Sequence, residues 1–160
     1  MIKVNLICVG KLKEAYWRDA CAEYSKRMGR YAEFCITEVD EEKLPDRPSQ
    51  AQISQALQKE GERILSRIPK GAQTAALCIE GRQYSSEMVA ELLEQNAAYG
   101  GGNMVFVIGG SWGLSDEVKK AASVKLSMSK MTFPHQLARV MLCEQVYRGF
   151  QILGHSQYHK

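Results

Sequence analysis

The chain has 160 residues, of which 45% are hydrophobic and 24% charged, and its net charge is +3. This length favours one domain with a hydrophobic core over two domains, and so small a net charge does not by itself indicate a nucleic-acid-binding protein. No apolar run approaches the roughly 18 residues of a membrane-spanning helix, and the first residues lack the order of a signal peptide, so we expect a cytoplasmic protein without a membrane partner.

The first half of the chain alternates strand and helix patterns. Residues 3–9 are predicted to form a buried strand, and apolar residues at helical spacing predict an amphipathic helix over 16–28. A second strand is predicted over 34–39. The polar stretch 40–50 contains two prolines and is expected to be an exposed loop, after which a helix is predicted over 51–67.

The second half continues the alternation. Strands are predicted over 74–79, 104–108 and 125–128, and helices over 85–98, from Ser115 onward, and over 136–151. Strands and helices therefore alternate five times. We predict a single α/β domain over residues 1–160, with a mostly parallel sheet, helices on both faces and right-handed crossovers.

Two strand-to-helix junctions lie close together in the last third of the chain. Residues 109–115, rich in glycine, follow the strand 104–108, and residues 128–135 follow the next strand. Parallel α/β sheets bind ligands beyond the carboxyl ends of their strands, so a ligand site is expected here. Glycines let the backbone approach a ligand closely, although the same loop would also fit a tight turn.

The second junction is mostly apolar and offers backbone amides, a composition suited to holding an adenine. His135 follows at the start of the last predicted helix, whose positive end favours the neutral imidazole. As a lone histidine it also fits a packing residue at the start of a helix.

The five cysteines are widely spaced and form no C-x-x-C motif, which argues against a zinc site or a disulfide framework. We interpret them as small buried hydrophobic residues in a reducing compartment and expect no metal site. They are Cys8, Cys21, Cys35, Cys78 and Cys143.

Basic residues are concentrated near the start of the chain. Residues 1–30 carry seven Lys and Arg against three acidic residues, whereas residues 31–68 are net acidic. This distribution fits either a phosphate-binding end of the molecule or a solvated helix face.

Three segments together resemble the RlmH family of SPOUT-class RNA methyltransferases. Residues 108–115 read I-G-G-S-W-G-L-S, residues 126–148 match the pattern L-S-x-S-x-M-T-F-P-H-x-L-A-R-V-x-L-x-E-Q-x-Y-R, and the chain ends Y-H-K. The resemblance extends over the whole length, from V-G-K-L-K at residues 9–13 to the tail. It implies a SPOUT fold with a C-terminal trefoil knot, which general rules of chain topology alone would not predict.

The resemblance also implies an activity. The family uses S-adenosylmethionine, without a metal, to methylate N3 of a pseudouridine in large-subunit ribosomal RNA, and it leaves S-adenosylhomocysteine. Family members act as homodimers in which each cofactor pocket lies near the partner. We therefore expect this chain to form a homodimer and to bind ribosomal RNA on the assembled ribosome through its basic N-terminal surfaces.

The site residues follow from the same resemblance. Cofactor contacts are implied at Leu77, Gly109, Met128, Ser129, Lys130, Met131, Thr132 and Phe133. Methyl transfer requires alignment above all, but N3 carries a proton that a base or a cation would help to remove. The candidates are His135, Arg139, Tyr158 and His159, and the sequence leaves open which of them accepts the proton.

Two segments depart from the family pattern. The glycine loop usually reads G-G-P-x-G, but Ser111 replaces the proline, a change expected to alter only the stiffness of the loop. The tail usually reads N-H-P-Y-H, but residues 155–159 read H-S-Q-Y-H, so only Tyr158 and His159 of the tail are carried over.

Two other functions remain as alternatives. A SPOUT methyltransferase acting on transfer RNA would share the pocket and the knot, but the chain lacks a tRNA-binding extension. A non-enzymatic nucleotide-binding or ribosome-associated α/β module would use the glycine loop without turnover, but would have no use for Tyr158 and His159 beside the cofactor.

Overall fold

The computed structural model describes residues 1–154, in which strands and helices alternate along the chain. The ten elements are β1 (Ile2–Val9), α1 (Ala15–Met28), β2 (Ala32–Val39), α2 (Gln50–Leu65), β3 (Gln73–Gln83), α3 (Ser86–Tyr99), β4 (Asn103–Ile108), α4 (Asp116–Ala121), β5 (Val124–Ser127) and α5 (His135–Leu153). Every predicted strand and helix is present.

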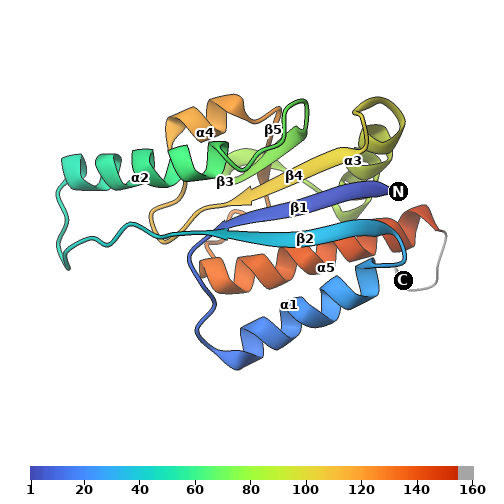
Figure 1. The fold of residues 1–160 in the computed structure, drawn as a ribbon, viewed down its shortest axis with the longest axis horizontal. Coiled ribbons are helices and arrows are strands. Elements are labelled where there is room, and N and C mark those ends of the chain that lie inside the picture. The colour runs from blue at the N-terminus through green and yellow to red at the C-terminus, as the bar shows by residue number, and fades with distance from the viewer. Residues whose placement is uncertain (155–160) are drawn as a thin grey trace.

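The strands form one sheet in the order β2-β1-β4-β3-β5, and all the pairs are parallel. The predicted single α/β domain with a parallel sheet is therefore confirmed. Figure 1 shows the strands side by side, with the N-terminus at the start of β1 on the right. Because all strands run the same way, their carboxyl ends meet at a single edge of the sheet.

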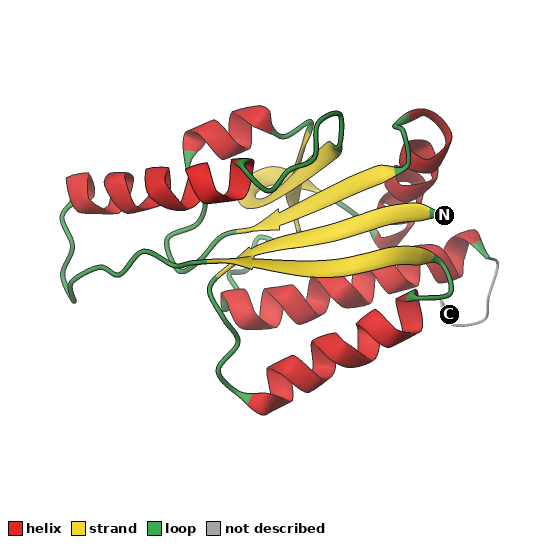
Figure 2. Cartoon of the chain, in the orientation of Figure 1, coloured by secondary structure: helices red, strands yellow, loops and turns green. Residues whose placement is uncertain are grey.

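Helices cover both faces of the sheet. Figure 1 shows α1 and α5 together on one side of the strands and α2 and α4 on the other, and Figure 2 shows the same layers by type of element. Alternate side chains of β1 point to opposite faces of the sheet. Leu6 and Cys8 pack in the core beneath α1, α3 and α5. Ile7 and Val9 pack in the core beneath α2 and α4. The central strand β4 is buried on both faces from Met104 to Ile108.

Serines begin several of the helices. The Ser85 hydroxyl accepts a hydrogen bond from the backbone N–H of Met88, as its predicted role at the start of α3 requires, and Ser49 caps α2 in the same way through Gln52. Ser115 caps α4. No helix within residues 1–154 combines the length and the hydropathy needed to cross a membrane.

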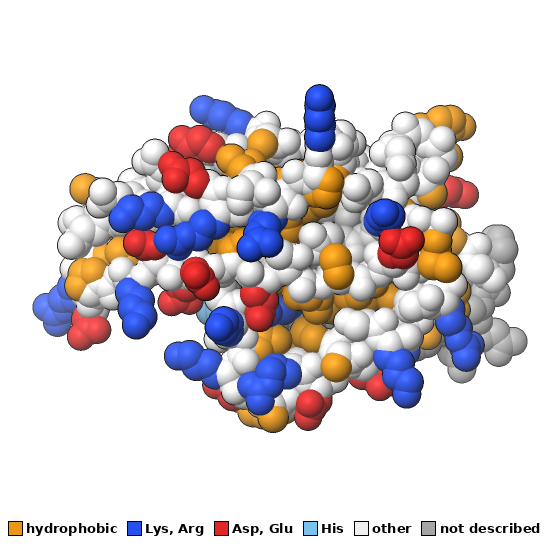
Figure 3. All heavy atoms as spheres, viewed as in Figure 1, with side chains coloured by type: hydrophobic (Ala, Val, Ile, Leu, Met, Phe, Trp, Pro, Cys, Tyr) orange, Lys and Arg blue, Asp and Glu red, His pale blue; other side chains and the backbone are white. Residues whose placement is uncertain are grey.

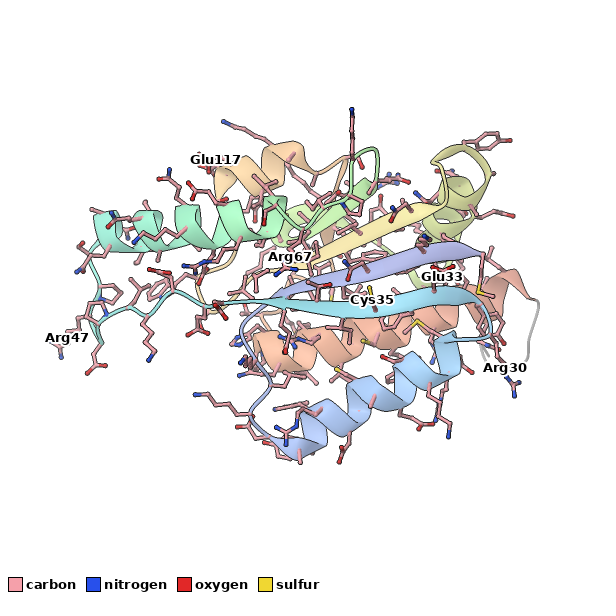
Figure 4. All side chains as sticks on the ribbon, in the orientation of Figure 1. Arg30, Glu33, Cys35, Arg47, Arg67 and Glu117 are labelled. Atoms are coloured by element: carbon pink, nitrogen blue, oxygen red, sulfur yellow. The ribbon has the colours of Figure 1, made fainter. Side chains whose placement is uncertain are left out.

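The prediction that every cysteine is buried is wrong for Cys35. Cys8, Cys21 and Cys143 are buried and Cys78 is partly buried, but Cys35 is exposed. It lies on the edge strand β2 with Glu33 (Figure 4), on the face that α2 covers only near the carboxyl end of the strand, where Val39 is buried. Flanking apolar residues in the sequence point to the opposite face and therefore misled the prediction.

The pairing of β3 with β5 is irregular, and its register shifts between Leu77 and Arg82. Gly81 lies in this shift, where an added Cβ would come 2.7 Å from the carbonyl group of Lys125. The two strands therefore approach too closely for any side chain at residue 81. The trefoil knot that the family resemblance implies stays a prediction.

Candidate functional site

A cavity of about 890 Å³ opens at the carboxyl ends of β4 and β5, beside the middle of β3. Both predicted junctions line it, so the glycine loop and the Met128–Phe133 loop form two walls of one pocket. Of the residues predicted to contact a cofactor, Lys130 alone is outside the lining. The lining includes Leu77, Gly109, Met128, Ser129, Met131, Thr132 and Phe133.

The glycine loop closes on itself beside the cavity. Gly110 and Gly113 form an isolated antiparallel bridge, and the N–H of Gly113 donates to the carbonyl of Gly110 at 3.1 Å. Gly113 has a φ of +83°, which favours glycine. An added Cβ at Gly109 would overlap the carbonyl group of Gly113. Glycine at residue 109 is therefore required by the fold of the loop itself, and not only by the approach of a ligand.

Two serines organise the wall that follows β5. The hydroxyl of Ser127 donates to the carbonyl of Ser129 at 3.0 Å, and the hydroxyl of Ser129 accepts from the N–H of Met131 at 3.0 Å. The segment turns sharply as a result and leads into α5. Met128 and Phe133 are partly buried, and Met131 is exposed.

His135 is the first residue of α5 and lines the cavity together with Gln136. Burial lowers the pKa of its imidazole, Glu41 acts in the opposite direction and Arg139 in the same direction. This direction favours the neutral imidazole, as expected from the sequence, which attributed it to the positive end of the helix. Its main cause is loss of solvent.

Arg139 lies one turn further along α5 and does not line the cavity. Its side chain is only 2% exposed, and its guanidinium donates to the Glu38 carboxylate at 2.6 Å and to the carbonyl of Gly10 at 3.1 Å. Arg139 therefore fastens the start of α5 to the carboxyl ends of β1 and β2. Its predicted catalytic role stays a prediction.

An ion pair that the sequence analysis missed lies in the lining. Lys119 on α4 contacts Glu80 on β3, and this contact lowers the pKa of the Glu80 carboxyl. Of this strand, the family resemblance placed only Leu77 at the site. Nothing in the sequence indicates that residues 39 positions apart form a pair.

The other two predicted catalytic candidates, Tyr158 and His159, lie outside the described residues. Within residues 1–154, no group of three or more His, Cys, Asp or Glu side chains is placed to hold a metal ion.

Comparison with known proteins identifies the family. A model of the family described as "Predicted SPOUT methyltransferase" matches residues 2–159. The chain belongs to the SPOUT methyltransferase family. The predicted resemblance is confirmed over nearly the whole chain.

Curated relatives of this SPOUT methyltransferase share its full length. Proteins named "Ribosomal RNA large subunit methyltransferase H" match 159 residues each, which is 99% of this chain and 100% of each relative. The identity is 48% for the protein of Bifidobacterium animalis subsp. lactis, 49% for that of Streptococcus mutans serotype c and 48% for that of an Exiguobacterium species. Within the SPOUT methyltransferases, the chain thus belongs to the RlmH family.

Proposed function

We propose that this protein uses S-adenosylmethionine to methylate N3 of a pseudouridine in large-subunit ribosomal RNA. The observation that carries the proposal is the single cavity formed by the glycine loop and the Met128–Phe133 loop, in a chain that matches relatives named for large-subunit RNA methylation over their whole length. Such a substrate implies that the protein works in the cytoplasm, on the assembled ribosome.

The lining suits an adenosine-containing cofactor. Leu77, Met128 and Phe133 supply apolar surface for the faces of a purine, and the backbone of the glycine loop supplies polar groups for its edge. A volume of about 890 Å³ lies near the upper end of the range for small-molecule sites, roughly 300–1,000 Å³, and leaves space for a substrate base beside the cofactor. The Glu80–Lys119 pair adds one charge of each sign to the wall.

S-Adenosylmethionine, when bound, supplies an electrophilic methyl group and leaves as S-adenosylhomocysteine. The contribution of the chain is alignment of the reacting atoms, exclusion of water by the apolar wall and removal of the N3 proton of pseudouridine. We propose His135 as the base that accepts this proton, because its imidazole lines the cavity and burial favours the neutral form. Tyr158 and His159 remain further candidates.

For Arg139 we propose a positioning role. Its bonds to Glu38 and Gly10 hold the first turn of α5, and therefore His135, against the sheet. Its positive charge also lowers the pKa of His135. Both effects keep a neutral imidazole at the cavity without contact between the guanidinium and the substrate.

We also propose that the protein works as a homodimer. A hollow of about 500 Å³ lies between α3 and α5, and Val140 and Met141 contribute to it. Met128 lines both this hollow and the cavity, so a partner seated here would adjoin the cofactor site. On the face in Figure 3, basic and acidic side chains are interspersed, so ribosomal contacts through a basic surface stay a prediction.

Incubation with radiolabelled S-adenosylmethionine tests the proposed function. Ribosomes from a strain lacking this gene should take up label in large-subunit RNA. Label in transfer RNA alone would support the tRNA-methylating alternative, and cofactor binding without any transfer would support the non-enzymatic one.

A further inference from the structure

Exposed apolar side chains gather at the mouth of the cavity. Among the described residues, the large hydrophobic side chains left exposed number seven, and three of these line this one cavity. They are Ile79, 62% exposed, Trp112, 54% exposed, and Met131, 72% exposed. Such a concentration beside a proposed cofactor site indicates a surface that another molecule covers.

Trp112 is held by the fixed part of the glycine loop. It lies between Gly110 and Gly113, whose bridge closes the turn, and Ser115 then caps α4 directly after it. The turn therefore presents the indole from a constrained backbone. An aromatic ring held in this way can stack on a flat ligand at little further cost in conformational entropy.

Trp112 also lines a second, smaller hollow. This hollow measures about 220 Å³ and lies against the loop between β2 and α2, from which Pro45 and Pro48 contribute. Its other lining residues include four acidic side chains, Glu41, Glu42, Asp46 and Glu60. Carboxylates repel phosphates but accept hydrogen bonds from the amino groups of bases. Glu42 already pairs with Lys59 and Arg63, but the remaining carboxylates still make this hollow less favourable for phosphate than for a base.

Proteins that recognise unpaired RNA commonly stack bases on exposed aromatic side chains. The target nucleotide must pass the mouth of the cavity for its N3 to reach the cofactor. We infer that Trp112 is a substrate-positioning residue that stacks on a base of the RNA at the mouth of the cavity. This inference rests on the proposed function, which it deepens by naming the side chain that receives the RNA.

Kinetics of methyl transfer to ribosomes tests the inference through three variants. Trp112→Ala should raise KM for ribosomes about tenfold, the effect expected for loss of one stacked base, while the affinity for S-adenosylmethionine measured by calorimetry stays unchanged. Trp112→Phe should restore most of the loss because it keeps an aromatic face. Tyr99→Ala is the matched control, since Tyr99 is 91% exposed but ends α3 at the opposite edge of the sheet, and its KM should equal that of the parent protein.

An unchanged KM for Trp112→Ala would overturn the inference, and so would a rise in KM for Trp112→Phe as large as that for Trp112→Ala. A parallel fall in cofactor affinity would also overturn it, because Trp112 would then support the pocket or be covered by another part of the protein. Co-sedimentation with large ribosomal subunits separates this inference from the proposed function. If the parent protein transferred no methyl group but bound subunits more tightly than Trp112→Ala did, the proposed function would fail and the stacking role would stand. Equal sedimentation of the two would refute the stacking role.

Discussion

The shape of the glycine loop and the binding of a ligand both depend on glycine at residue 109. The family resemblance implies that Gly109 contacts the cofactor. The structure adds that any Cβ at Gly109 would overlap the carbonyl group of Gly113, the residue whose N–H donates to Gly110 and closes the loop. A substitution therefore has to reshape the wall of the cavity, whatever the ligand.

Gly109→Ala should weaken the binding of S-adenosylmethionine at least about tenfold in calorimetry, because the loop can no longer close in its present form. Gly110→Ala is the matched control, since its Cβ would meet Val9 at 3.4 Å, an ordinary contact. The control should keep most of its affinity. Equal affinities for the two variants would contradict the prediction, because closure of the loop would then not determine the affinity for the cofactor.

The pH dependence of activity tests the role of His135. Burial lowers the pKa of its imidazole, so the neutral base persists to lower pH than for an ordinary histidine, whose pKa is 6.5. We expect kcat/KM to rise with pH along an acid limb centred below 6.5 and then to level off.

His135→Ala should lower kcat about 10²- to 10⁴-fold and abolish that limb, the usual range for loss of a general base. Gln136→Ala, a change at a neighbouring lining residue that does not titrate, should keep the limb. An acid limb that survives in His135→Ala would mean that another group accepts the N3 proton.

At the scale of elements, apolar patterns in the sequence predicted the five strands and the four longer helices, and the capping residue Ser115 predicted α4. The two loops of the cavity were also predictable, since parallel strands end at one edge. What escaped prediction depends on long-range contacts: the Glu80–Lys119 pair, the exposure of Cys35 and the burial of Arg139 against Glu38, which lies 101 positions away in the sequence. A local pattern carries no information about which distant element covers a residue.

The contacts of Arg139 attach the first turn of α5 to the sheet. Arg139→Met should lower the free energy of unfolding by about 2 kcal/mol, because it leaves the Gly10 carbonyl without its hydrogen bond and removes the ion pair with Glu38, whose side chain is partly exposed. Arg148→Met on the same helix disrupts an i,i+4 pair with Glu144 and should cost about 1 kcal/mol or less. Urea denaturation measures both.

A second readout distinguishes positioning from a purely structural role for Arg139. Its charge lowers the pKa of His135, so its removal should move the acid limb of kcat/KM toward higher pH. An unchanged limb in folded Arg139→Met protein would leave Arg139 with a structural role alone.

At the scale of the whole molecule, the proposed homodimer places a partner on the hollow between α3 and α5. Met141→Glu introduces a charge into that hollow and should convert the dimer to a monomer in light scattering coupled to size-exclusion chromatography. Tyr99→Glu, at the far end of α3, should remain dimeric. A Met141→Glu protein that stays dimeric would place the interface elsewhere.

The chemical identity of the methylated nucleoside tests the proposed function most directly. Ribosomes lacking the modification would be treated with the protein and S-adenosylmethionine, and their large-subunit RNA digested to nucleosides for chromatography and mass spectrometry. We predict that N3-methylpseudouridine forms with the parent protein and is strongly reduced with Gly109→Ala. A methyl group on any other nucleoside, or none in large-subunit RNA, would contradict the proposed function.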